Sequence, residues 1–413
     1  MTKRSSRGTP RAVEKCLAVA LVLAAVLALA AFASANPIEE DESASGVGAT
    51  PVVANVIPQK QIVPVRGSDG RWHAMYELLL TNTVAAKATL KSVAVLDPAS
   101  GRRLLTISAK QMVAEDLKML DRNPVKSPTL PAEGSRALFV SVSFGSRKSI
   151  PQRLTQRFQL TAVNPFTSRN EKFSYRAGAV NISSKQPPVL VPPLRGGTWL
   201  ASDGCCTASG HVSALYGLDG SLQAAERYAI DWMEIGPDGR IYHGDPAVLS
   251  NWYGYGKPLL SVSAGVVTEA KGDLPDQTPL VKPGTLSLGD LPGNVVVVRM
   301  KSGLSAVYAH LVPGSLKVKV GDRVTAGQEL GRLGNSGGSL APHLHFHVVN
   351  GPSASTSDGY PYVLSSFQLA ASSDVGALGE ALQGKAGFPT AAQLHPVAHQ
   401  DELPLGFTID QFP

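Results

Sequence analysis

Three histidines at alternating positions are the residues of this chain with the clearest capacity for chemistry. His343, His345 and His347 lie in the run Pro-His-Leu-His-Phe-His-Val at residues 342–348. In a β-strand, residues i, i+2 and i+4 project from one face, so the three imidazoles are expected side by side. Imidazole is the commonest metal ligand in proteins, and a packed core does not require such a row. With nine histidines in the whole chain, we favour a metal site over a solvent-facing strand that carries histidines by chance.

A second group of motifs precedes this strand. Tyr308-Ala309-His310-Leu311 is followed by Gly-Asp-Arg-Val at 321–324, Gly-Gln-Glu-Leu-Gly at 327–331 and Gly-Asn-Ser-Gly-Gly at 334–338. These glycines allow tight turns between the strands of a small, strongly curved β-structure. With the histidine strand, the motifs at about residues 261–350 resemble the core of lysostaphin-type (LytM-like) zinc metallopeptidases, which cleave peptide bonds in peptidoglycan.

The resemblance implies one Zn²⁺, bound by the His and Asp of an H-x-x-x-D motif and by the second His of H-x-H. On this chain the Asp corresponds to Asp231, in Arg-Tyr-Ala-Ile-Asp-Trp, and the second His to His345. His310 and His343 correspond to the catalytic pair that polarises water and stabilises the tetrahedral intermediate. Three protein ligands and a water are what a hydrolytic zinc site needs.

The sequence departs from this family at the first ligand. Arg227, not His, stands four residues before Asp231, and arginine cannot bind a metal because it stays protonated. The preferred replacement is His211. Strands at 212–216 and 222–228, joined by a three-residue loop with Gly220 in the left-handed conformation, would place His211 opposite Arg227. A shift of one residue would turn His211 to the other face.

Other candidates for the missing ligand stay open. His243 follows Asp231 in an expected loop, and a thiolate of Cys205 or Cys206 would also bind zinc. His347 is expected to orient groups around the metal, with a direct ligand role as the alternative. A branch of the family with Ala-Ile-Asp-Trp and a preceding Gly-Cys-Cys segment resembles this chain at 204–211 and 229–232. Arg227 is expected to face the site and bind a substrate anion or Asp231, the alternative being surface charge.

The N-terminus has the layout of a secretory signal. Basic residues precede an apolar run at 16–33, and Ala33-Ser34-Ala35 predicts cleavage before Asn36. The alternative is an uncleaved membrane anchor, since the apolar run is nearly long enough to span a bilayer. Both place the protein outside the cytoplasm, in the periplasm or extracellular space. In such an oxidising compartment Cys205 and Cys206 can form a disulfide, although two small buried side chains are the favoured interpretation.

The remaining chain is expected to be mainly β. Its 40 Gly and 30 Pro favour short strands and turns. After the signal peptide (1–35) and a disordered leader (36–50), period-two segments at 51–184 predict an immunoglobulin-like β-sandwich with one short helix at about 109–120. A Pro-rich linker (185–194) leads to the metallopeptidase domain (195–369), a lysostaphin-type curved antiparallel β domain (barrel-sandwich hybrid-like). The tail at 370–413 has little periodicity and is left unassigned.

The function implied by the resemblance is zinc-dependent hydrolysis of peptide bonds in peptidoglycan, with peptide stems or cross-bridges as substrates. The alternatives are a degenerate, non-catalytic scaffold that binds the cell wall or activates another hydrolase, and an assembly protein that reuses the fold. A net charge of +6 suits an anionic polymer, but we expect no nucleic-acid partner, and membrane contact only through an uncleaved N-terminus. A regulatory protein partner is compatible with the enzyme and with the scaffold. A loop at 271–292 is expected to form a wall of the substrate groove.

Overall fold

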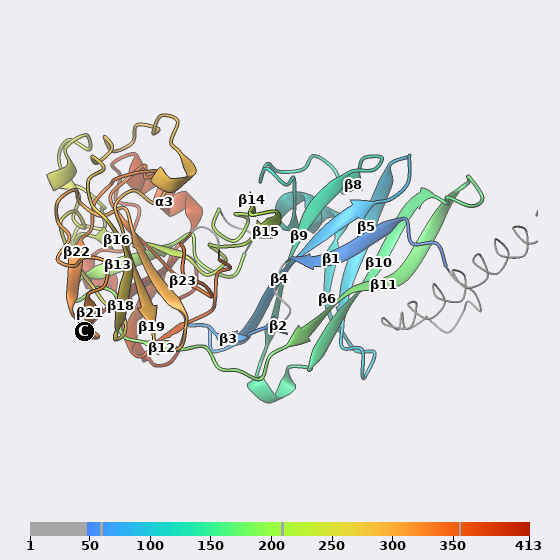
Figure 1. Ribbon diagram of the computed structural model, residues 1–413, viewed down its shortest axis with the longest axis horizontal. Coiled ribbons are helices and arrows are strands. Elements are labelled where there is room, and N and C mark those ends of the chain that lie inside the picture. Colours follow the sequence, from blue (N-terminus) through green and yellow to red (C-terminus); the bar gives the residue numbers. More distant parts are fainter. Residues whose placement is uncertain (1–47, 58–60, 208–209, 355–356) are drawn as a thin grey trace, which may run out of the picture. The chain divides into compact units, whose positions relative to one another are not determined.

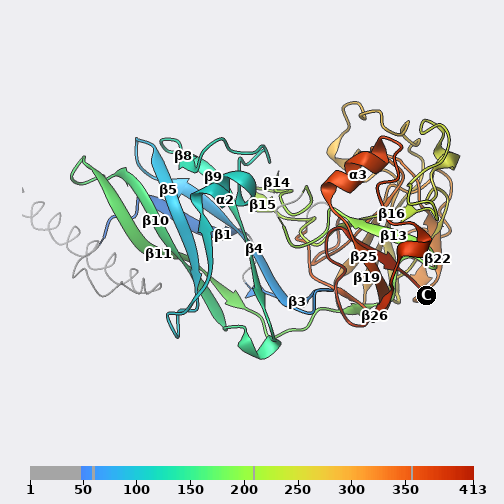
Figure 2. The same cartoon turned by 180° about the vertical axis from the view of Figure 1, so that it is seen from behind.

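The period-two segments near the N-terminus form two sheets around a common core. The computed structural model describes residues 48–57, 61–207, 210–354 and 357–413, so the predicted signal peptide and most of the leader lie outside the described residues. One sheet contains β1 (Val52–Ile57), β3 (Val65–Arg66), β4 (Trp72–Asn82), β7 (Leu117–Lys118) and β9 (Ser135–Phe144). The other contains β2 (Gln61–Ile62), β5 (Ala88–Leu96), β6 (Arg103–Ser108), β8 (Thr129–Leu130), β10 (Arg153–Val163) and β11 (Asn170–Ile182) (Figures 1 and 2).

The side chains between these sheets explain their pairing. Tyr76 and Leu78 on β4 pack in one cluster with Val93 on β5 and Phe158 on β10. Burying this apolar surface is the main force that holds two such sheets together. The prediction of a mainly β chain is confirmed, whereas the immunoglobulin-like character of this part stays a prediction. The expected helix at about 109–120 is shorter: α2 (Ala109–Gln111) and one wider helical turn (Met112–Asp116) end where β7 begins.

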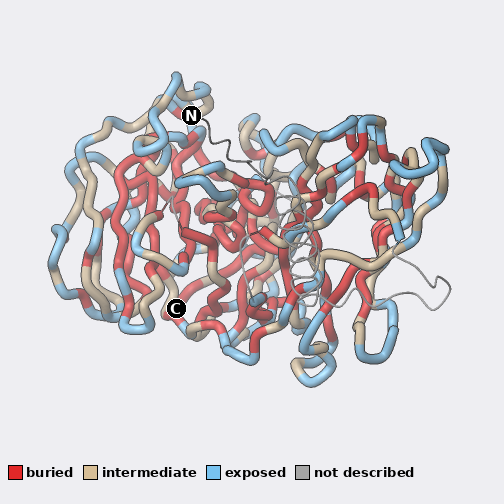
Figure 3. The backbone as a smooth tube through the Cα atoms, turned by 45° about the vertical axis from the view of Figure 1, so that its right-hand side comes forward, coloured by how far each residue is buried: buried red, intermediate tan, exposed pale blue. Residues whose placement is uncertain are grey.

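A ten-stranded sheet forms the C-terminal part. Its order is β21-β18-β19-β20-β23-β16-β13-β27-β25-β26. The bounds are β13 (Thr198–Ser202), β16 (Ile230–Ile235), β18 (Gly265–Lys271), β19 (Val295–Met300), β20 (Ser305–Ala309), β21 (Arg323–Val324), β23 (Leu344–Val349), β25 (Phe367–Ser372), β26 (Val397–His399) and β27 (Thr408–Gln411). The histidine strand β23 therefore lies between β20 and β16, near the middle of the sheet. The residues of β20 and β23 are all buried, as are five of the six residues of β16. Figure 3 shows that buried residues gather in the interior of the fold, while many of its loops are exposed.

Three two-stranded ladders complete the fold. They are β12 (Val189–Leu190) with β24 (Val363–Leu364), β14 (Tyr216–Leu218) with β15 (Ser221–Gln223), and β17 (Pro258–Leu260) with β22 (Glu329–Arg332). The loop at 272–294 contains only a single helical turn, Leu288–Asp290. Other single turns lie at Arg147–Ser149, Leu249–Asn251 and Ala391–Gln393. Within the described part of the chain, no helix is both long and apolar enough to cross a membrane.

The C-terminal tail, unassigned from the sequence, belongs to the ten-stranded sheet. After the helix α3 (Val375–Leu382), β27 pairs antiparallel with both β13 and β25. Ile409 of β27 and Phe412, just after that strand, are buried, and the Phe412 ring meets Trp232 of β16 edge-on with ring centroids 5.1 Å apart. The tail therefore stabilises the strand that carries Asp231.

A buried ion pair joins the two parts of the chain, which belong to one compact unit at residues 49–413. Arg227 Nε donates to Glu77 Oε1 of β4 at 2.8 Å, and Arg227 Nη1 donates to the Gly359 carbonyl at 3.1 Å. Both side chains are almost fully buried, at 0% and 1% exposure. Burial would lower the pKa of Arg227, but the Glu77 carboxylate outweighs it and raises that pKa. The expectation that Arg227 faces the metal site or the surface is therefore wrong: it points into the contact with the sandwich.

This pair makes a prediction about stability. Glu77→Gln keeps the shape of the side chain but leaves the buried Arg227 guanidinium without its ion-pair partner. We expect the free energy of unfolding, measured by chemical denaturation, to fall by about 3–5 kcal/mol. Replacing both members by apolar residues, as Glu77→Leu with Arg227→Met, should recover most of the loss because no unpaired charge remains.

An exposed pair supplies the matched control. Glu380 and Lys385 are 58% and 60% exposed and 4.0 Å apart, so Glu380→Gln should change the free energy of unfolding by no more than about 1 kcal/mol. If Glu77→Gln destabilises the protein no more than Glu380→Gln does, the buried pair does not hold the two parts together.

Cys205 and Cys206 lie at the same contact. They form a disulfide with each other, which differs from the favoured expectation of two free buried thiols. Cys205 is buried against Met75 of β4, with the two sulfur atoms 3.1 Å apart. The adjacent cysteines therefore pack against the sandwich.

Candidate metal centre

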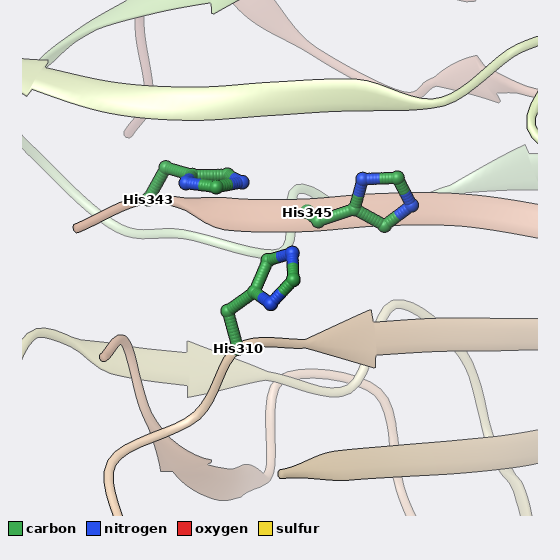
Figure 4. A group of neighbouring side chains, drawn as sticks. All are labelled: His310, His343 and His345. Carbon is green, nitrogen blue, oxygen red and sulfur yellow. The ribbon is translucent and has the colours of Figure 1, made fainter. Parts of the chain in front are cut away.

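The register of three neighbouring strands brings the predicted site residues together. Asp231 of β16 is paired with His345 of β23, and Ala309 of β20 is paired with His345 from the other side. His310 follows Ala309 directly, and His343 precedes β23 by one residue, on the same face as His345. In Figure 4 the ring of His310 points toward the strand that carries the other two histidines.

Imidazole nitrogens surround the carboxylate of Asp231. Its Oδ1 lies 2.9 Å from His345 Nδ1, 3.3 Å from His343 Nε2 and 3.4 Å from His211 Nε2. Burial would raise the pKa of Asp231, but the facing histidines His211 and His343 outweigh it and hold that pKa well below its usual value. A partly buried carboxylate that stays ionised is a suitable partner for a cation.

Among the residues that the structure describes, two overlapping sets of donors could hold a metal ion. His211, Asp231 and His345 form one, and His310, His343 and His345 form the other, with the ligand atoms of each set within 4.8 Å of one another. The first set contains a carboxylate, which offsets part of the charge of a divalent ion, and two imidazoles. Two imidazoles and one carboxylate are an established ligand set of catalytic zinc sites. We therefore favour His211, Asp231 and His345.

His211 arrives at the site by a different route from the expected one. The hairpin pairs Gly217 with Leu222, not with Ser221, because its loop has only two residues, Asp219 and Gly220, both with positive φ. Positive φ at both loop residues is typical of a tight type I′ turn. The paired strands are three residues long, and His211 lies before them in a turn, so it is not the cross-strand partner of Arg227.

Asp203 fixes the position of His211. Asp203 directly follows β13, whose last residue, Ser202, is paired with Asp231 of β16. The Asp203 carbonyl accepts a hydrogen bond from His211 Nδ1 at 3.0 Å, and its carboxylate accepts from the backbone N–H of His211 at 3.2 Å. With Nδ1 occupied, Nε2 is the nitrogen that faces Asp231. Burial opposes protonation of His211, but Asp231, Asp203 and Glu226 outweigh it and raise its pKa to about 9.

His310 and His343 are oriented in the same way. His310 Nδ1 donates to the Ser336 carbonyl at 2.8 Å, and His343 Nδ1 donates to the Ala341 carbonyl at 2.7 Å. The Nε2 atoms are therefore the nitrogens left for chemistry. Burial and the neighbouring His343 and His345 hold the pKa of His310 well below its usual value. Burial also acts to lower the pKa of His343, but Asp231 outweighs it and raises that pKa.

The other candidate ligands lie outside both donor sets. His243 is exposed and contacts the Tyr253 ring with centroids 5.6 Å apart. Cys205 and Cys206 are bonded to each other. His347 is buried, and its Nδ1 lies 3.0 Å from His345 Nε2, the ring nitrogen of His345 that is turned away from Asp231. This contact suits the expected role of orienting His345, which stays a prediction.

The site opens into a cavity of about 460 Å³. His211, Asp231, His310, His343 and His345 all line it. The expected loop wall is present, since Leu288, Leu291 and Pro292 line the same cavity. A cavity of this size lined by apolar side chains and a few convergent polar groups is typical of ligand-binding sites.

Sequence reasoning missed three contributors to this site. Asp203 precedes the cysteine pair without any recognisable spacing to His211, and the Ser336 and Ala341 carbonyls act through the backbone, which no side-chain pattern reveals. Only the Gly-Asn-Ser-Gly-Gly segment gave a signal, as a turn that leads into the histidine strand.

The comparison with known families identifies this part of the chain. Residues 252–356 match the family model of Peptidase family M23. This segment is therefore similar to family M23, and its motifs resemble those of the lysostaphin-type (LytM-like) group.

Two curated relatives are similar over this region. Lysostaphin of Staphylococcus staphylolyticus is 34% identical over 134 residues, which cover 32% of this chain and 24% of the relative. Cell division protein DipM of Caulobacter vibrioides (strain NA1000 / CB15N) is 32% identical over 97 residues, which cover 24% of this chain and 13% of the relative. The chain thus spans a quarter or less of the length of these relatives.

Among solved structures, the catalytic domain of the antimicrobial peptidase lysostaphin from Staphylococcus simulans is similar. The match has 23% identity and a TM-score of 0.21, and it covers 40% of this chain and 88% of that domain.

Proposed function

We propose that this protein is a zinc-dependent endopeptidase that hydrolyses peptide bonds in peptidoglycan. The observation that carries the proposal is the convergence of His211, Asp231 and His345 beside His310 and His343 in one cavity. The chain thus has three candidate ligands and two additional imidazoles, although Arg227 occupies the position of the usual first ligand. Support for the substrate comes from the family and from the name lysostaphin among the relatives.

Zinc fits the residues present. Members of family M23 are zinc metallopeptidases, and the donor atoms of His211, Asp231 and His345 are close enough for one ion. Each histidine is held with a defined nitrogen toward Asp231, as ligand histidines usually are. When bound, zinc supplies Lewis acidity, which polarises the scissile carbonyl and makes a water molecule more acidic.

His310 and His343 would act on the water and on the carbonyl oxygen. Because His310 Nδ1 donates to Ser336, its Nε2 has a lone pair that can accept a proton from water. His343 has a raised pKa and Nε2 toward the site, so it can donate a hydrogen bond to the oxyanion of the tetrahedral intermediate. The two histidines face each other with ring centroids 4.8 Å apart.

The wider setting is also a proposal. The basic, apolar and Ala-Ser-Ala segments at the N-terminus favour export to the cell envelope, where peptidoglycan lies. The sandwich at 51–184 would be an accessory domain, followed by the linker (185–194) and the peptidase domain (195–369).

Incubation of the zinc-loaded protein with purified peptidoglycan tests the function. We expect new amino groups to appear and to be detected by dinitrophenylation, because peptide-bond hydrolysis releases one amine for each bond cleaved. A chelator should stop the reaction and added zinc should restore it. New reducing ends without new amines would instead indicate cleavage of the glycan. Binding to peptidoglycan without any new amines would overturn the enzyme proposal in favour of the scaffold.

A further inference from the structure

The sandwich contributes a cation to the cavity that contains the candidate metal centre. Arg122 lies in the turn between β7 and β8, and it lines this cavity together with Tyr216 and Glu226 of the C-terminal part. The turn is ordered by backbone hydrogen bonds from Arg122 N to the Met119 carbonyl and from Met119 N to the Asn123 carbonyl, both 2.9 Å. The sandwich therefore contributes Arg122 to the lining of this cavity.

The guanidinium of Arg122 is positioned but not neutralised. Its Nη1 donates to Tyr216 Oη at 3.2 Å, and its Cζ lies 5.3 Å from the centroid of the Tyr216 ring. Within the described ranges, no carboxylate lies within ion-pair distance of Arg122. A guanidinium has five N–H donors in a planar fork that matches a carboxylate. After the bond to Tyr216, donors remain for such a ligand.

Arg122, Tyr216, Glu226 and His211 all line the same cavity. Tyr216 contacts Arg122, and Glu226 lies close enough to both Tyr216 and His211 to raise the pKa of each. Pro292 lies next to His310, whose backbone N–H donates to the Pro292 carbonyl at 2.9 Å. Leu288, Leu291 and Leu340 line the cavity as well and are 43%, 38% and 44% exposed. The lining therefore combines polar groups with exposed apolar side chains.

We propose that Arg122 binds a free carboxylate of the peptidoglycan stem peptide, on the His211 side of the bond that is cleaved. The inference rests on the proposed function for the choice of substrate. Stem peptides carry free carboxylates unless these are amidated, and an arginine fork binds a carboxylate through two parallel N–H···O bonds. Glu226 is half-buried and lines the same cavity. Its carboxylate can accept a hydrogen bond from a peptide N–H of the substrate residue that bears the free carboxylate. The sandwich would thus determine specificity.

Binding of the metal-free full chain to purified peptidoglycan tests this, measured by sedimentation with unmodified wall and with wall amidated through carbodiimide coupling. We expect the wild type to bind unmodified wall about tenfold more tightly than amidated wall, the usual contribution of one charged hydrogen-bonded contact. Arg122→Gln should bind both walls with the lower affinity. Thermal unfolding of the variant confirms that it is folded.

Arg103→Gln is the matched control. Arg103 is exposed on β6 of the same domain and does not line the cavity. Its replacement by glutamine removes one positive charge, as Arg122→Gln does. This variant should discriminate between the two walls as the wild type does. If it loses discrimination as fully as Arg122→Gln, or if Arg122→Gln binds unmodified wall as tightly as the wild type, the inference is overturned. Failure of hydrolysis with preserved discrimination would overturn the proposed function alone.

Discussion

Alanine in place of His310 or His343 should lower the rate of amine release from peptidoglycan by about 10²–10⁴-fold, the usual contribution of a positioned acid or base. Zinc should remain bound in both variants, because neither residue belongs to the favoured ligand set. The expectation rests on their Nδ1 protons, which are held by the Ser336 and Ala341 carbonyls and leave Nε2 for the reaction. Activity assays with parallel metal analysis of each variant measure both quantities.

His243→Ala is the control for these variants. It removes an exposed histidine of the same part of the chain, outside both donor sets, and should keep both zinc and activity. The contrary outcome is also defined. If His310→Ala and His343→Ala lose zinc together with activity, the metal is held by His310, His343 and His345, the second donor set.

Local patterns predicted the parts of the site that depend on strand periodicity. The alternation of His343, His345 and His347 predicted one strand, and β23 (Leu344–Val349) contains His345 and His347, with His343 directly before it. The mainly β character followed from the same alternation at β4 and β9. In these segments the alternation alone assigns each side chain to one face of the sheet, so a few residues are enough to predict a strand.

The predicted position of His211 depended on the pairing register of the hairpin at 212–228, which the sequence defines only to within one residue. Because Asp219 adopts the left-handed conformation, the hairpin loop has two residues and not three. The paired strands begin at Tyr216 and so do not include His211. His211 nevertheless faces Asp231, because Asp203 holds it from β13. Such a contact between a turn and a strand end leaves no periodic trace.

Arg227 and the C-terminal tail were beyond local reasoning for another reason. Glu77, the partner of Arg227, lies 150 residues earlier in the chain, and only the contact between the two parts of the fold pairs them. Strand β27 has four residues, too few for a period-two pattern to stand out. In both cases tertiary contacts decide the outcome.

His211→Ala should abolish stoichiometric zinc binding. It removes one of three proposed ligands, while Asp231 and His345 remain as a two-ligand site. Loss of a partner that merely orients a ligand already lowers metal affinity by about 10–100-fold, so loss of a ligand should cost more. His345→Ala and Asp231→Ala should lose zinc to the same extent.

The most direct test of the whole account is the zinc content of the purified full chain and of His211→Ala, dialysed at neutral pH against a small excess of zinc and measured by atomic emission. We predict one zinc per wild-type chain and essentially none in the variant. One zinc in both would show that His211 is not a ligand, and none in the wild type would contradict the metallopeptidase proposal itself.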